Sequence, residues 1–160
     1  MAATNPFVVL SYVGGPALLT NASSVFIMST ANRFARAIDR ARALSLQGDT
    51  LPGEDRIAEI RLAHRRVDLI ARAMQCFYFA AGMFALGTLA SIAGAVVSEI
   101  QNAQIFDAVV LGAAAVGFAG FIAFITGAFN LVIESRLAAR AVAIEADAAL
   151  AALLGQKENA

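Results

Sequence analysis

The lysine and arginine residues of this 160-residue chain fall into two blocks, Arg33–Arg72 and Arg136–Lys157. Neither residue type occurs in 1–32 or in 73–135, and these two stretches are also where the apolar residues concentrate. A charged side chain is costly in hydrocarbon, and loops rich in Lys and Arg remain on the cytoplasmic side of a membrane. The pattern therefore predicts a membrane protein with both basic blocks in the cytoplasm.

Composition supports this prediction and narrows the function classes. The hydrophobic fraction of 59% and the mean hydropathy of +0.70 exceed those of ordinary soluble domains. Nucleic acid is an unlikely partner class, because nine basic residues of the first block share it with six acidic ones. One cysteine, Cys76, excludes an intramolecular disulfide. The N-terminus lacks the basic region of a cleaved signal peptide, which favours an uncleaved first helix with its N-terminus outside.

Three membrane spans are expected within one domain, 1–160, at about 7–31, 75–97 and 108–133. Gly14-Gly15-Pro16 interrupts the first, so a regular helix is predicted to start near Pro16 and 7–15 to form a separate piece. The join 98–107 carries two acidic residues and no basic one, which places it outside. The predicted fold is an all-α membrane protein with three transmembrane helices, N-out and C-in.

Apolar residues at three- and four-residue spacing continue beyond each span. We expect a cytoplasmic helical hairpin over 33–74, turning at 46–53, and a C-terminal helix over 134–155. Together they would form a helical bundle below the membrane. The three predicted series are Phe34, Ala37, Ala41 and Leu44; Ile57, Ile60, His64, Val67, Ala71 and Met74; and Leu137, Ala141, Ile144, Ala148 and Ala151.

The first span has an unusually polar side. Several copies that bring this face together would enclose a water path lined by Thr20, Asn21 and Ser24, with Ile27 and Met28 as a hydrophobic constriction. The alternative is that these hydroxyl and amide groups hydrogen-bond to the other two helices of the same subunit. In the second and third spans, small residues recur at fourfold spacing, which favours close helix packing.

The residues Asn32, Arg33, Arg36, Asp39, Arg40 and Arg42 form a distinctive run just after the first span. Arg33, Arg36 and Arg40 share one flank of a helix, and Asp39 can pair with Arg36 or Arg42. The simplest role is anchoring, in which arginine heads meet anionic lipid headgroups. The alternative is an arginine ring at the cytoplasmic mouth of a pore.

The sequence contains no recognisable catalytic grouping, so an enzyme is not expected. His64 is the only histidine and falls on the 57–74 series, where its titration would affect packing near neutral pH. The other interpretation is a polar register residue or a solvent-facing one. A single histidine without a Cys or carboxylate cluster predicts no metal site, and nothing indicates a cofactor.

The string Pro16-Ala17-Leu18-Leu19, followed by the run from Asn32 to Arg42, resembles the family called domain of unknown function 2721. The resemblance covers roughly 7–137 and implies a bacterial integral membrane protein with three helices, but no activity. We therefore expect a multi-pass protein of the bacterial inner membrane. Its leading predicted function is a homo-oligomeric pore for small ions, and the alternative is a structural or regulatory subunit of a larger membrane complex.

Overall fold

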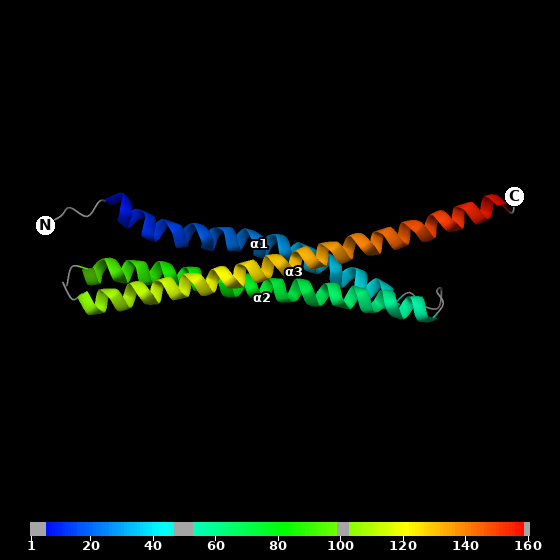
Figure 1. The fold of residues 1–160 in the computed structure, drawn as a ribbon. Helices are drawn as coiled ribbons and strands as arrows, with labels where there is room; N and C mark the ends of the chain where they lie inside the picture. The colour runs from blue at the N-terminus through cyan, green and yellow to red at the C-terminus, as the bar shows by residue number, and fades with distance from the viewer. Residues whose placement is uncertain (1–5, 47–52, 99–102, 159–160) are drawn as a thin grey trace.

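The structure, a computed structural model, describes residues 6–46, 53–98 and 103–158, and all of them are helical. The three helices are α1 (Pro6–Leu46), α2 (Gly53–Ser98) and α3 (Ala103–Glu158). They run side by side in an elongated bundle, with the two chain termini at opposite ends (Figure 1). The expectation of an all-helical fold is confirmed. Most of the predicted turn at 46–53 lies outside the described residues. Of the predicted join 98–107, only 99–102 lie outside them, and 103–107 form the first part of α3.

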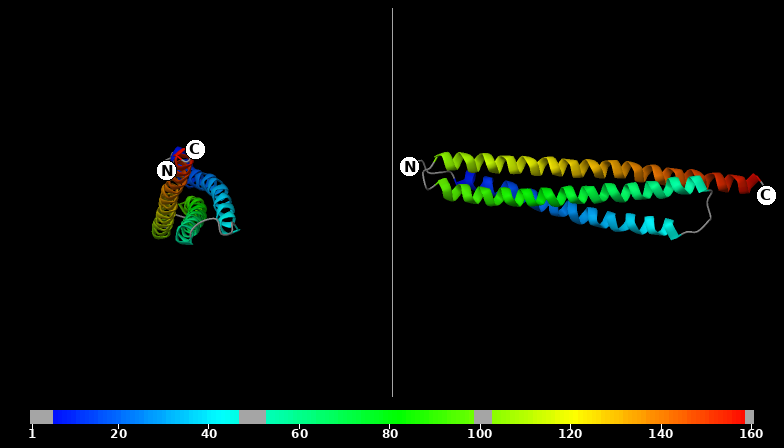
Figure 2. Two further views of the ribbon diagram at one scale, coloured as in Figure 1. Left: turned by 90° about the vertical axis from the view of Figure 1, so that its right-hand side faces the viewer. Right: turned by 90° about the horizontal axis from the view of Figure 1, so that it is seen from below.

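Helix α2 is the centre of the bundle. Both α1 and α3 pack along it in antiparallel directions, whereas the backbones of α1 and α3 approach each other at very few positions. Seen from below, α1 diverges from α3 toward the end where α1 and α2 meet (Figure 2). Side chains that link α1 to α3 must therefore reach across the face of α2.

The buried side of α2 follows a heptad pattern, which is the signature of coiled-coil packing. Its buried positions alternate by three and four residues: Ile70, Ala73, Phe77, Ala80, Phe84, Gly87 and, one heptad on, Gly94. The buried positions of α1 are spaced by seven: Ser23, Thr30, Ala37 and Leu44. Pro16 is one heptad earlier and lies opposite Gly87.

Helix α3 presents glycines to the large side chains of α2. A Cβ placed on Gly120 would lie 2.8 Å from Cε1 of Phe84, and one on Gly127 would lie 2.9 Å from Cε1 of Phe77. Both distances are too short for real atoms, so each phenyl ring occupies the space that a glycine leaves free. These two close approaches set the spacing between α2 and α3.

A cluster of phenylalanines joins all three helices at the middle of the bundle. The ring centroids of Phe26 (α1), Phe77 (α2) and Phe124 (α3) are 5.1–5.3 Å apart. Phe84 and Phe121 form a second edge-to-face pair at 5.9 Å. Such pairs add roughly 0.5–1.5 kcal/mol each beyond the area they bury. In this aromatic layer, Phe26 of α1 touches Phe124 of α3 across α2.

Two helices, α2 and α3, are long and apolar enough to cross a membrane. Only 6% of the apolar window of α3 is buried, and large side chains such as Leu111, Phe118 and Ile125 point outward. Helix α1 does not meet this criterion over its described residues.

Two local predictions differ from the structure. Helix α1 is continuous across Gly14-Gly15-Pro16 rather than starting near Pro16. A proline removes only one helical N–H, and the Pro16 carbonyl still accepts a hydrogen bond, from Oγ1 of Thr20 at 3.0 Å. In α2, the buried positions are Ile70 and Ala73 rather than Ala71 and Met74, because the seam follows the heptad of Phe77.

Candidate functional site

Below the aromatic layer, the core of the bundle changes from apolar to charged. Glu134 follows Gly120 and Gly127 at the same sevenfold spacing on α3 and occupies the next core position. Its side chain is only 5% exposed. A buried carboxylate is stable only when it is paired and hydrogen-bonded, so the surroundings of Glu134 decide whether the bundle tolerates it.

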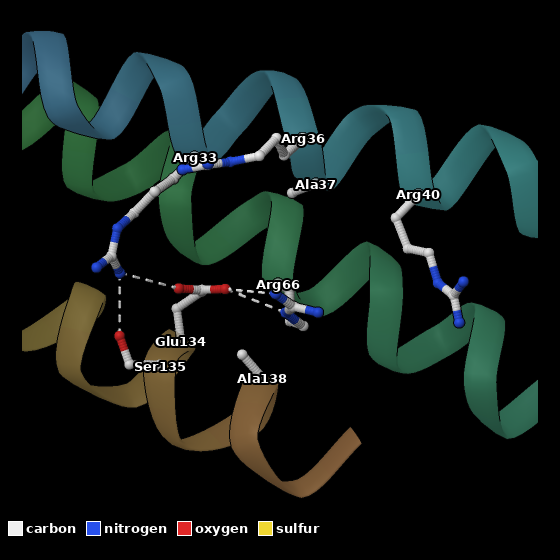
Figure 3. A pocket seen from close by; sticks show the side chains of 8 residues that line it. All are labelled: Arg33, Arg36, Ala37, Arg40, Arg66, Glu134, Ser135 and Ala138. Carbon is white, nitrogen blue, oxygen red and sulfur yellow. Dashed lines mark hydrogen bonds and ion pairs between the residues drawn. The ribbon is translucent and has the colours of Figure 1, made fainter. Parts of the chain in front are cut away.

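Arg66 supplies most of that compensation. It lies one heptad before Ala73 on α2, so it also holds a core position. Its Nε and Nη2 both donate to Oε1 of Glu134, at 3.1 and 3.0 Å (Figure 3). The side chain of Arg66 is 26% exposed, so the pair is only partly shielded from water.

Arg33 reaches the same carboxylate from α1. Its Nη1 lies 3.6 Å from Oε2 of Glu134 and donates a hydrogen bond of 3.1 Å to Oγ of Ser135. Arg33 is one heptad after Phe26, so the aromatic layer and the charged layer link α1 to α3 in the same way. Among the described residues, no buried side-chain nitrogen or oxygen lacks a hydrogen-bond partner.

These residues surround an open cavity of about 440 Å³ between α1 and α3, floored by α2. It is lined by Arg33, Arg36, Ala37, Arg40, Arg66, Glu134, Ser135 and Ala138. Four arginines thus face one carboxylate. Arg40 also pairs at 3.4 Å with Glu59, outside the cavity lining. Within the described part of the chain, Arg36 has no ion pair or hydrogen bond, so its charge is available to a ligand.

Arg33, Arg36 and Arg40, which were predicted to share one flank of a helix, all line this cavity. Asn32, Asp39 and Arg42 are exposed. The predicted pairing of Asp39 with Arg36 or Arg42 is wrong for the described residues, because neither ion pair forms there. On a helix with ample solvent, an exposed pair gains little over separate hydration.

Of the five residues predicted to line a pore, three lie on the side of α1 that turns away from the core, and two lie beside its buried seam. Asn21, Ser24 and Met28 are exposed, and Thr20 and Ile27 are partly buried. Met28 is 72% exposed. The chain as a single subunit therefore leaves this face uncovered, and the prediction that it lines a pore stays a prediction.

The buried hydroxyl groups of α1 do not behave as the alternative interpretation expects. Ser23 and Thr30 are completely buried against α2, yet their hydroxyls donate to carbonyls of their own helix, Leu19 at 2.9 Å and Phe26 at 2.6 Å. Small hydroxyl residues satisfied in this way allow close packing without an interhelical hydrogen bond.

His64 is exposed and does not belong to the buried seam of α2. Its Nδ1 lies 2.9 Å from the carbonyl oxygen of Ile60 and is placed to donate to it. The ring lines a second, mainly apolar cavity of about 510 Å³, together with Ile38, Ala41, Arg42, Ser45, Leu46 and Val67. A pH-sensitive role for His64 stays a prediction. No group of His, Cys, Asp or Glu side chains in the described segments could hold a metal ion.

Comparison with protein families assigns the chain to a group. The model of a family described as proteins of unknown function, DUF2721, matches residues 14–144. The chain belongs to the DUF2721 family. Comparisons with curated proteins and with solved structures gave no match. The family match therefore confirms the resemblance and leaves the function to be argued from the bundle itself.

Two central residues of the charged cluster in this DUF2721 chain were missed by sequence reasoning. Neither Glu134 nor Arg66 has a role in the predictions from sequence, where Arg66 is only one of the nine basic residues of the first block. A signal for Glu134 existed, because it continues the sevenfold series of Gly120 and Gly127. Arg66 likewise continues the series of Ala73 and Ala80.

Proposed function

We propose that this DUF2721 protein spans the bacterial inner membrane three times, with its N-terminus outside and its C-terminus in the cytoplasm. Two observations support the proposal. Helices α2 and α3 are long and apolar enough to cross. In the antiparallel bundle, every Lys and Arg falls in the half that holds the α1–α2 connection and the end of α3, which is the half that basic residues would retain in the cytoplasm.

We further propose that several copies assemble into a pore for small ions, lined by the outward face of α1. The observation that carries this proposal is the position of Asn21. It lies between the layer where Pro16 meets Gly87 and the layer where Phe26 meets Phe77. At this depth α2 and α3 expose large apolar side chains, including Leu86 and Phe121. Asn21 is therefore an exposed amide at the level of the hydrocarbon.

Burying the outward face of α1, which carries Asn21, against neighbouring copies is energetically favourable. An amide with no hydrogen-bond partner in hydrocarbon costs several kcal/mol, by an order-of-magnitude estimate. Asn21 has no hydrogen bond to any described residue of its own subunit. Water enclosed by neighbouring copies of α1 removes this cost for Asn21, whereas the exposed hydroxyl of Ser24 already donates to the carbonyl oxygen of Thr20 at 3.0 Å.

The same face of α1 also provides a contact surface for neighbouring copies. Toward the basic end, Met28 is followed at three- and four-residue spacing by Ala31, Ala35 and Ile38, of which the two alanines are exposed. Small residues at this spacing allow helices to approach closely. In the proposed assembly, Thr20, Asn21 and Ser24 line water, and Ile27 and Met28 form a dewetting constriction above a dry contact.

Cysteine accessibility tests the proposal, in a Cys76→Ala background within liposomes. Asn21→Cys and Ser24→Cys are compared with Leu18→Cys and Val25→Cys. Leu18 and Val25 are 71% and 63% exposed on the single subunit, so they are matched controls. A charged, water-soluble thiol reagent is expected to modify the first pair and spare the second, which faces lipid. Modification of Met28→Cys should also block ion flux.

Equal inertness of Asn21→Cys, Ser24→Cys and the two controls would show that no water reaches this face and would reject the pore. An unrelated protein that copurifies at fixed ratio and protects all of these positions would instead support an accessory subunit of a larger complex.

A further inference from the structure

We propose that the cavity between α1 and α3 is a binding site for a phosphate group carried by an anionic ligand. The site lies within one subunit and is formed by Arg33, Arg36, Arg66 and Ser135 around Glu134. It does not depend on the oligomeric pore, because none of its residues belongs to the proposed pore lining.

Charge is the first argument. The cavity collects four arginines from two helices and a single carboxylate. Glu134 and Glu59 together compensate two of these positive charges, through Arg66 and Arg40. The other two arginines of the lining, Arg33 and Arg36, are both exposed. Guanidinium groups present planar, forked N–H donors that match phosphate oxygens, and a dianionic or monoanionic phosphate would restore electrical balance.

The second argument is that Glu134 holds Arg66 and Arg33 with different geometries. Arg66 is held by two hydrogen bonds to Glu134, both close to 3 Å. Arg33 is held more loosely, because its contact with Glu134 is 3.6 Å long and its side chain is 45% exposed. Arg33 can therefore turn toward a ligand while Arg66 continues to neutralise the buried carboxylate. The charged cluster thus contains a structural pair and an available arginine.

Ser135 adds a neutral donor at the same place. Its Oγ accepts a hydrogen bond from Arg33, which leaves its own O–H free to donate toward the cavity. Ser135 is exposed, and Arg36 lines the cavity from α1 (Figure 3). A hydroxyl donor beside two guanidinium groups suits a tetrahedral phosphate better than a planar carboxylate. The volume of about 440 Å³ is ample for a phosphate group.

The phosphate can come from a lipid headgroup or from a soluble anion. The cavity lies where the Lys- and Arg-free stretch 73–135 ends, one residue before Arg136. In the orientation argued under Proposed function, this is the level of the cytoplasmic headgroups, and the opening between α1 and α3 faces outward. The lipid source therefore rests on that orientation, whereas binding of free phosphate does not.

The test uses the full chain purified in a neutral detergent. Calorimetric titrations with inorganic phosphate, short-chain phosphatidylglycerol and short-chain phosphatidylcholine are carried out on the wild type and two variants. The first variant combines Arg33→Gln and Arg36→Gln. The control variant combines Arg42→Gln and Arg61→Gln, which removes the same charge from exposed positions of α1 and α2 outside the cavity.

We expect saturable binding of at least one phosphate probe, and on the order of tenfold weaker binding in the cavity variant, from loss of charge-assisted hydrogen bonds. The control should stay within about twofold of wild type, a modest change in long-range electrostatics. Saturation by phosphatidylglycerol but not by inorganic phosphate assigns the site to a lipid. Saturation by both assigns it to the phosphate group itself.

Two results would overturn the proposal. One is equal weakening in the cavity and control variants, which would mean attraction to the overall basic surface. The other is no saturable binding of any phosphate probe by a wild type that shows a cooperative thermal transition. Failure of the pore would leave both measurements unchanged, because none of the cavity residues belongs to the proposed pore lining.

Discussion

Arg66 and Glu134 lie 68 residues apart in the chain, and two hydrogen bonds from the guanidinium to Oε1 join them in the core between α2 and α3. Each holds a position where the heptad pattern would ordinarily place an apolar residue. A displacement of α3 along α2 would separate the pair and bury an unpaired carboxylate. The pair therefore fixes the register of α3 against α2, much as single polar residues do in coiled coils.

Removing the charge of Glu134 should destabilise the bundle. Glu134→Gln leaves Arg66 partly buried without its anion, and breaking a fully buried pair typically costs roughly 3–5 kcal/mol. Because the side chain of Arg66 is 26% exposed, we expect a smaller loss of unfolding free energy, about 2 kcal/mol. Denaturant titration of the detergent-solubilised protein measures it.

The matched control for this change is Glu59→Gln. The side chain of Glu59 is 31% exposed and that of its partner Arg40 is 48% exposed. We therefore expect Glu59→Gln to lower the free energy of unfolding by less than about 1 kcal/mol. If Glu59→Gln lowered the free energy of unfolding as much as Glu134→Gln does, the Arg66–Glu134 pair would be no more important to stability than a surface pair, which would contradict its assignment to the core.

Gly127→Ala should disturb the contact between α2 and α3, because the new methyl would lie 2.9 Å from Phe77. Overpacking of this kind costs about 1–3 kcal/mol. Gly112→Ala is the control, since its Cβ would meet no atom within 4 Å. Thermal denaturation should show a lower Tm for Gly127→Ala and an unchanged or slightly higher Tm for Gly112→Ala. Partial recovery in Gly127→Ala/Phe77→Leu would identify the phenyl ring as the cause.

Phe77→Ala should be among the most destabilising single substitutions. Phe77 is fully buried and contacts both Phe26 and Phe124, so its loss opens a cavity that touches all three helices. Truncations of this type cost about 3–5 kcal/mol. Phe79, two residues on, is 56% exposed, and Phe79→Ala should change stability far less. Comparable losses of unfolding free energy would argue against the aromatic layer as the centre of the core.

Labelling in intact cells checks the proposed orientation. In a Cys76→Ala background, a membrane-impermeant thiol reagent should modify Gln104→Cys, near the start of α3, in intact bacterial spheroplasts. Ser45→Cys, near the end of α1, should react only after the membrane is opened. Both native side chains are exposed in the bundle. A cysteine that fails to react is therefore protected by the membrane and not by burial in the fold. The reverse labelling pattern would invert the topology.

The helical character and the lengths of α2 and α3 were predictable, because charge-free apolar stretches and the breaker cluster at 46–53 are strong local signals. The arginine flank of α1 was predictable too, since three- and four-residue spacing places side chains on one face of a helix. The break at Pro16 was predicted wrongly. A proline within a long helix removes one hydrogen bond, which the remaining helix and its packing on α2 outweigh.

The pairings across helices were not predictable from spacing alone. Small-residue rows in α3 indicated tight packing, but only the structure shows that Gly120 and Gly127 accommodate Phe84 and Phe77. The charged cluster was not predicted, for the same reason. Arg33, Arg66 and Glu134 come from three helices, and their meeting depends on a register that no single stretch of sequence encodes.

The central claim is that copies of this chain gather around the outward face of α1. Single-particle imaging of the solubilised protein, with Fab fragments bound to a tag on the C-terminus, tests it most directly. The account predicts a ring of identical subunits with rotational symmetry, α1 next to the axis and the Fab fragments all on one side. A monomeric particle, or a ring with α2 or α3 nearest the axis and α1 at the rim, would contradict it.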